Sequence, residues 1–152
     1  MLNTSEVDLA AAHSLRSRLV SVVLEWERSF GVAPTITSAL SEYDAARLVG
    51  HSDATFNEDC TGRTAVTKGC DFRLNGVRYQ VKANRPSGKP GSFVTLVAQA
   101  RNYDWDRLIW ILYDKAYVIQ EAWEWECEQY KAAFGSKTRL SPKDMRLGRR
   151  LR

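Results

Sequence analysis

Residues 70–82, CDFRLNGVRYQVK, carry three side chains of chemically active type: Asp71, Gln80 and Lys82. The Asn-Gly dipeptide at positions 75 and 76 predicts a two-residue turn between two antiparallel strands. Counting outward from that turn places Asp71 opposite Gln80, with Cβ atoms roughly 5 Å apart, and Lys82 diagonally beside Asp71. An acid, an amide and an ammonium group therefore converge, as a binding or reactive site requires.

The two faces of this hairpin differ in polarity. Side chains alternate along a strand, so one face is apolar and is expected to contact the core through Phe72, Leu74, Val77, Tyr79 and Val81. The opposite face adds Arg73 and Arg78 to the three polar residues. An antiparallel hairpin often has one solvated polar face without any function. On the hairpin alone, this second interpretation is the simpler one.

A helix expected from about residue 37 to residue 49 supplies a further acid. Thr37 or Ser38 can cap its start, and Gly50 ends it. Glu42 falls on the small-residue stripe that should face the sheet, together with Ala39, Ala45, Ala46 and Val49. A carboxylate directed toward an interior tends to be paired, metal-bound or functional, because burying it alone is costly. The alternative is a rim position just outside the stripe.

Together these residues resemble the PD-(D/E)xK superfamily, the restriction-endonuclease-like nucleases. The pattern consists of Glu42 on an early helix, Gly69-Cys70-Asp71 entering one strand, and Gln80-Val81-Lys82 on the next. The resemblance covers roughly residues 36–120. The chain is a variant, because Gln80 stands where the family has a second acid. The implied fold is α/β, with a restriction-endonuclease-like core and a mixed sheet flanked by helices.

The resemblance implies metal-dependent hydrolysis of a nucleic-acid phosphodiester. Asp71 would be the main Mg²⁺ ligand, completed by the Gln80 side chain and the backbone carbonyl of Val81, while Glu42 would bind directly or through water. Mn²⁺ would be a substitute metal. These oxygen ligands suit Mg²⁺. Lys82 would lie beside the attacking water and stabilise charge on the phosphorane.

A nuclease also needs positive charge around its carboxylates. The candidates near the hairpin are Lys68, Arg85, Lys89 and Arg101, and those of the C-terminal segment are Arg146, Arg149 and Arg150. Such side chains position a phosphate backbone but do not read bases. Each of them also has an alternative interpretation as ordinary solvated surface.

Three functions are therefore considered. The first is an endonuclease acting on DNA, in restriction or another defence role that rests on family association alone. The second is a catalytically silent module that binds nucleic acid or assembles with other proteins, and the third is a nuclease or toxin domain acting on RNA. A duplex-cutting enzyme of this kind often works as a homodimer, although the sequence shows no dimer surface.

Other elements follow from periodicity and from turn residues. Residues 5–30 predict a long helix whose apolar stripe includes Leu15, Leu19, Val22, Val23, Trp26 and Phe30. Residues 51–69 are expected to be mainly loop, with a short strand at 64–67, and residues 85–92 a mobile loop. Strands are expected at 93–97, 107–114 and 116–120. Residues 98–104 are expected to form a short helix or a turn, and residues 122–134 a helix. Trp26, Trp110 and Trp123 are assigned to the core.

Length and composition fit one domain over residues 1–152, with a basic segment at 137–152. That segment carries seven basic residues against Asp144, a net charge of +6, which leaves −2 for residues 1–136 of the total of +4. It suggests contact with a polyanion or simply a solvated tail. No apolar run is long enough to span a bilayer, so a cytoplasmic protein is expected. Three cysteines without zinc spacing are interpreted as reduced thiols.

Overall fold

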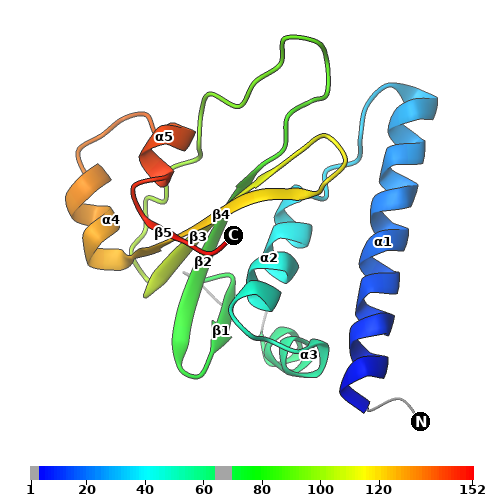
Figure 1. Ribbon diagram of the computed structural model, residues 1–152. Coiled ribbons are helices and arrows are strands. Elements are labelled where there is room, and N and C mark those ends of the chain that lie inside the picture. The colour runs from blue at the N-terminus through cyan, green and yellow to red at the C-terminus, as the bar shows by residue number, and fades with distance from the viewer. Residues whose placement is uncertain (1–3, 64–69) are drawn as a thin grey trace.

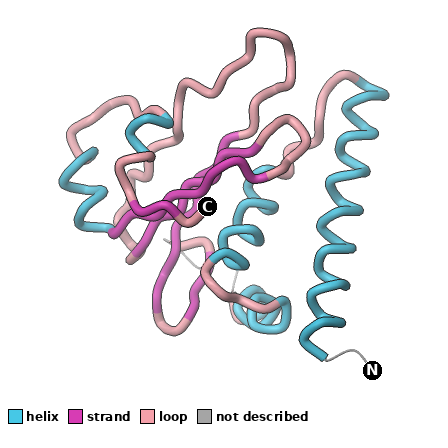
Figure 2. Tube along the Cα trace, in the orientation of Figure 1, coloured by secondary structure: helices cyan, strands magenta, loops and turns pink. Residues whose placement is uncertain are grey.

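The computed structural model describes residues 4–63 and 70–152 and arranges them in three layers (Figure 1). A five-stranded sheet lies in the middle, with three helices on one face and two on the other (Figure 2). The first face is covered by α1 (Thr4–Phe30), α2 (Thr37–Leu48) and α3 (Asp53–Thr61), and the second by α4 (Cys127–Phe134) and α5 (Pro142–Met145).

The sheet is mixed, as the sequence predicts. Its strands lie in chain order: β1 (Phe72–Leu74), β2 (Val77–Asn84), β3 (Arg107–Tyr113), β4 (Ile119–Glu126) and β5 (Arg149–Arg150). Only β2 and β3 run parallel, and every other neighbouring pair is antiparallel. The connection from β2 to β3 is a long loop, so the short helix or turn expected at 98–104 is absent from this described segment.

The hairpin of β1 and β2 has the predicted register. Phe72 pairs with Tyr79 and Leu74 with Val77. Asn75 and Gly76 have φ values of 50° and 79°, the left-handed conformation that this turn requires. Phe72 and Tyr79 are buried and stack with ring centroids 4.7 Å apart. The apolar face of the hairpin therefore belongs to the core, as expected.

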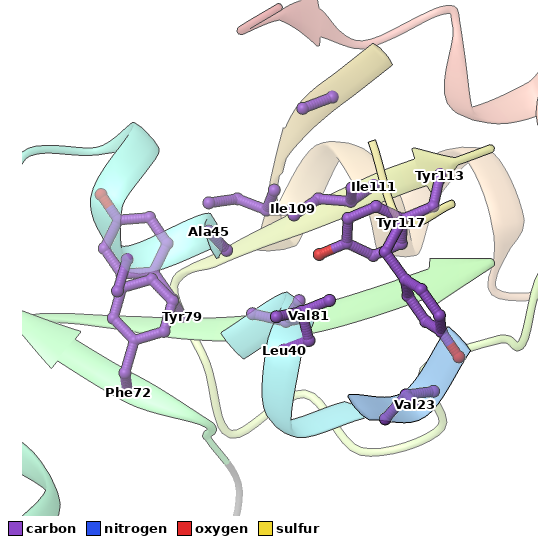
Figure 3. Packing of buried hydrophobic residues seen from close by; sticks show 12 residues of the cluster. Val23, Leu40, Ala45, Phe72, Tyr79, Val81, Ile109, Ile111, Tyr113 and Tyr117 are labelled. Carbon is purple, nitrogen blue, oxygen red and sulfur yellow. The ribbon is translucent and has the colours of Figure 1, made fainter. Parts of the chain in front are cut away.

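Strand β3 is buried on both faces and divides the core into two clusters. Ile109 and Ile111 pack toward α2, in the cluster shown in Figure 3. Leu108 and Trp110 pack toward α4 and α5. All four are completely buried, so the predicted core position of Trp110 is confirmed. An apolar run without alternation is what a strand covered by helices on both sides needs.

Several predicted elements are wrong. The segment expected to be loop contains α3, which begins with a capping box between Ser52 and Thr55. The strand expected at 93–97 is reduced to one bridge between Val97 and Leu140. The short strand expected at 64–67 lies outside the described residues. Helix α2 begins after Ile36 without a side-chain cap, so neither predicted cap residue has that role.

The segment 122–134, expected to be one helix, is a strand in its first part and a helix in its second part. Residues up to Glu126 belong to β4, which hydrogen-bonds to β3 on one side and β5 on the other, and only Cys127–Phe134 form α4. Trp123 lies half-buried in β4 beneath the Arg150 guanidinium. Pairing with two neighbouring strands outweighs the helical spacing of its apolar residues.

Helix α1 forms as predicted, but most of its apolar stripe faces outward. Val23 is buried, whereas Leu15, Leu19, Val22, Trp26 and Phe30 are exposed. The buried face is fixed by two polar anchors. Arg16 pairs with Asp44 at 2.7 Å, and Glu27 pairs with Arg85 at 2.9 Å. The predicted core role of Trp26 is therefore wrong, because these ion pairs turn its side of the helix away from the sheet.

In the described part of the chain, no helix combines the length and the apolar character needed to cross a membrane.

Candidate functional site

The four residues singled out in the sequence line one pocket. Glu42, Asp71, Gln80 and Lys82 border a cavity of about 260 Å³, together with Thr37, Ser38, Ser41, Val81, Ala83 and Ala98. The pocket thus lies between α2, the start of the hairpin and the outer edge of β2. The expected convergence of a helix acid with the hairpin residues is what the structure shows.

The pocket exists because β1 is short. In the described residues, the ladder between β1 and β2 ends at Phe72 and Tyr79, while β2 continues to Asn84. The polar face of β2 and the face covered by α2 are opposite sides of the sheet, since Gln80 and Lys82 lie beside Leu108 and Trp110 of the second cluster. Beyond Tyr79, no strand among the described residues pairs with this edge of β2, and side chains from both faces of the sheet reach the pocket there.

Asp71 lies just before β1 and turns into this open edge. Its backbone N–H donates to the Tyr79 carbonyl at 2.7 Å, and its Oδ2 accepts from the Val81 N–H at 2.7 Å. The ladder ends at Phe72 and Tyr79, so Asp71 and Gln80 are not one of its pairs, although both line the pocket. Both backbone groups of a strand residue point to the same side. The Val81 carbonyl consequently faces the same edge as the Asp71 carboxylate.

Burial makes both carboxyl groups of the pocket costly to ionise. Burial, followed by repulsion from Asp71, raises the pKa of Glu42 to about 7, against an ordinary value of 4.5. Burial also raises the pKa of Asp71, while the Val81 N–H, Lys82 and Arg63 act in the opposite direction. Because burial makes ionisation of both acids costly and Asp71 repels the Glu42 carboxylate, a bound cation would favour their charged forms.

Arg63 is a neighbour that the sequence did not identify. It donates from Nη1 to the Asp71 carbonyl and pairs through Nη2 with Asp59 at 3.2 Å. Arg63 lies just after α3, so its contacts connect this helix to Asp71 at the start of the hairpin. A segment expected to be loop gave no signal for this contact.

The donor set fits a single hard cation. The described residues contain no group of three or more His, Cys, Asp or Glu side chains suited to a metal. The reason at this pocket is that the third side chain is an amide, Gln80. Two carboxylates, one amide oxygen and the Val81 carbonyl remain, all of them oxygen ligands of the kind that Mg²⁺ prefers.

Larger cavities lie elsewhere among the described residues, and two of them are lined by a buried acid. One of about 380 Å³ is lined by Arg16, Asp44 and Arg152, and one of about 800 Å³ by Arg107, Glu124 and Arg149, among others. In both, the buried acid is already paired with a neighbouring arginine. Neither cavity brings two acids together without a cation between them, so the smaller pocket remains the candidate site.

Three of the seven predicted phosphate contacts are paired with acids of the same chain. The Arg85 side chain, 8% exposed, pairs with Glu27 and lies over the Tyr117 ring. Arg146 pairs with Glu121 at 2.6 Å and Arg149 with Glu124 at 3.0 Å. These partners leave less positive charge available for phosphate than the sequence suggests.

Other predicted contacts stay open to solvent. Lys89 and Arg101 are exposed on the loop between β2 and β3, and neither has an ion pair within residues 4–63 and 70–152. Arg150 is exposed and stacks on Trp123. Lys68 lies outside the described residues. The loop that follows β2 is therefore the better-supported surface for phosphate.

Compared with known proteins, the sequence matches no protein-family model and no curated protein.

The raised pKa of Glu42 gives a testable pH dependence. Mg²⁺ and a proton compete for the same carboxylate. We expect Mg²⁺ to raise the melting temperature little at pH 6, where Glu42 is mostly protonated, and clearly more at pH 8. Between about 4.5 and about 7 the metal-free folded state binds more protons than the unfolded state, so its stability falls as pH rises through this window.

Thermal unfolding at both pH values, with Mg²⁺ or EDTA, measures this effect. Glu42→Gln removes the titrating group and keeps the shape of the side chain, so its Mg²⁺-induced shift should no longer depend on pH in this range. An equal shift at pH 6 and pH 8 in the unmodified protein would mean that Glu42 does not bind the ion.

Proposed function

We propose that this chain is a Mg²⁺-dependent endonuclease that hydrolyses phosphodiester bonds in DNA, with a core of restriction-endonuclease type. The observation that supports this proposal most is the convergence of Glu42, Asp71, Gln80 and Lys82 on one pocket. These are the residues on which the family resemblance rests, and they come from separate elements. The mixed five-stranded sheet with helices on both faces is compatible with such a core.

Each residue has a distinct task in this mechanism. Mg²⁺, when bound, supplies Lewis-acid activation of the phosphate and of a water molecule. Asp71 and Glu42 provide the negative charge that holds the ion, and Gln80 and the Val81 carbonyl provide neutral oxygens. Lys82 keeps a fixed positive charge beside the reacting phosphate, where it opposes the charge that develops in the transition state.

DNA is the proposed substrate, held near the pocket by the exposed Lys89 and Arg101. A role in restriction or another defence process follows only from the family association. RNA is the alternative substrate, and the same assay distinguishes the two.

A second candidate function is a catalytically silent module that binds nucleic acid or takes part in an assembly. Gln80 favours it, because an amide in place of an acid leaves the site with one negative charge less for the metal. Under this proposal the pocket would bind nucleic acid without cleaving it.

The test is cleavage of plasmid DNA and of structured RNA by the purified protein in Mg²⁺, Mn²⁺ or EDTA, beside Asp71→Asn. Asparagine can still accept the bond from the Val81 N–H but carries no charge. We expect DNA cleavage that needs the metal and falls by at least about 10²-fold in Asp71→Asn. Arg78→Ala, on the hairpin but outside the pocket lining, is the matched control and should cleave normally.

Cleavage that survives Asp71→Asn would overturn the mechanism. Binding of DNA without cleavage in either metal would support the silent module. Cleavage of RNA alone would assign the site to the alternative substrate.

A further inference from the structure

The exposed apolar face of α1 is a surface feature that the proposed function leaves unexplained. Five side chains form it, called here the outer stripe: Leu15 (64% exposed), Leu19 (41%), Val22 (60%), Trp26 (51%) and Phe30 (69%). The rings of Trp26 and Phe30 lie 4.8 Å apart. Helix α1 stands at the outside of the molecule (Figure 1). Contiguous apolar surface of this kind usually marks an interaction site.

The outer stripe has the spacing of a helix-pairing seam. Leu15, Leu19, Val22 and Trp26 are separated by four, three and four residues, the repeat by which two helices interlock side chains. From residue 15 to residue 30 the stripe is about 22 Å long at the rise of an α-helix. The buried residues of the same helix, Val20, Val23 and Leu24, occupy another face and already pack on the core.

The charges beside the stripe select an arrangement. Arg18 directly precedes Leu19, Glu25 directly precedes Trp26, and both are exposed. If a second copy of α1 packs antiparallel, with Leu19 beside the partner's Val22, then Arg18 lies near the partner's Glu25. Twofold symmetry forms this pair twice. Charges at such flanking positions determine the orientation of paired helices.

A parallel pairing has no such complementarity. The flanking position opposite Arg18 would then be the partner's Val23, which is buried in its own core, and the one opposite Glu25 would be the partner's Phe30. The antiparallel arrangement is therefore the one that matches opposite charges while covering the apolar residues of both copies.

We propose that two copies of this chain form a homodimer by antiparallel packing of their α1 helices through the outer stripe. This inference goes beyond the proposed nuclease function and does not rest on it. The stripe exposes roughly 500 Å² of apolar surface per copy, from the usual area of aromatic and aliphatic side chains. Two copies would bury about 1,000 Å², at the lower end for a specific interface, so the dimer should be reversible and dissociate at micromolar concentration.

Sedimentation equilibrium on the full chain, over a concentration series from about 1 to about 300 μM, tests the proposal. Arg18→Glu and Glu25→Arg each place like charges together twice, and each should weaken dimerisation about tenfold. The double variant restores opposite charges in swapped positions and should return the dissociation constant to within about threefold of the original. Arg18 also has an interaction within its own chain, so the rescue by the double variant is the decisive measurement.

A second variant tests the apolar part of the interface. Val22→Glu should abolish the dimer, whereas Val118→Glu should not, although Val118 is similarly exposed at 54% in the turn before β4. Circular dichroism confirms that each variant is folded. A protein that remains monomeric at the highest concentration overturns the proposal. A dimer that both single charge reversals leave intact overturns the antiparallel arrangement.

Discussion

We expect the replacement of Lys82 by methionine to lower the rate of the proposed Mg²⁺-dependent DNA cleavage by roughly 10²–10³-fold, the usual cost of removing one group that stabilises transition-state charge. Lys82 lines the pocket together with both acids and lies close enough to Asp71 to influence its pKa. Methionine keeps an unbranched apolar side chain of similar length but removes the positive charge. Single-turnover cleavage at saturating protein measures the chemical step separately from binding.

Metal binding provides the internal control for Lys82→Met. The ammonium group of Lys82 repels a cation in the same pocket, so its removal should leave the affinity for Mg²⁺ unchanged or raise it. Lys89→Met removes an exposed lysine outside the pocket and should weaken DNA binding while leaving the single-turnover rate at saturation nearly unchanged. If Lys82→Met cleaves within threefold of the unmodified protein, Lys82 has no role in the chemical step.

The hairpin could be predicted from the sequence because its signals are local. Asn75-Gly76 specifies the turn, and the turn specifies the register of Phe72 with Tyr79. Counting residues outward from the turn also predicted that the side chains of Asp71 and Lys82 lie close together, and both line the pocket. The count did not predict that β1 is too short to cover the edge of β2. The length of β1 depends on where Asp71 leaves the ladder to accept the bond from the Val81 N–H.

The orientation of α1 could not be predicted in the same way. Periodicity shows that one side of a helix is apolar, but it does not show whether the core or another molecule covers that side. The face that α1 buries is selected by Arg16 and Glu27, whose partners lie 28 and 58 residues away in the chain. Partners so distant leave no pattern in a single sequence.

The same reason explains the basic residues. Arg146 and Arg149 follow one another closely in a basic segment, and the local count of charges suggests contact with a polyanion. Their acidic partners, Glu121 and Glu124, lie on β4, each 25 residues away in the chain. Ion pairs with acids of β4 thus neutralise Arg146 and Arg149, so this segment has less positive charge available for a polyanion than the local count suggests.

We expect the replacement of Asp44 by alanine to destabilise the protein by about 3–5 kcal/mol, the usual effect of breaking a buried ion pair by removal of one partner. The Asp44 side chain is 6% exposed and accepts two bonds from Arg16, at 2.7 and 2.8 Å, and one from the Tyr113 hydroxyl at 2.6 Å. Its loss leaves Arg16 and Tyr113 without these acceptors between α1, α2 and β3. Urea unfolding followed by circular dichroism measures the change in the free energy of unfolding.

A double-mutant cycle separates the ion pair from the packing around it. Arg16→Met alone leaves a buried carboxylate without its cation, whereas Arg16→Met with Asp44→Leu removes both charges and fills the space with apolar atoms. We expect the double variant to be more stable than either single variant, because uncompensated charge causes most of the loss. Arg78→Ala breaks the exposed pair with Asp106, whose side chains are 43% and 44% exposed, and should cost less than about 1 kcal/mol. A cost for Asp44→Ala no larger than this control would mean that α1 is held by its apolar contacts and not by the Arg16–Asp44 pair.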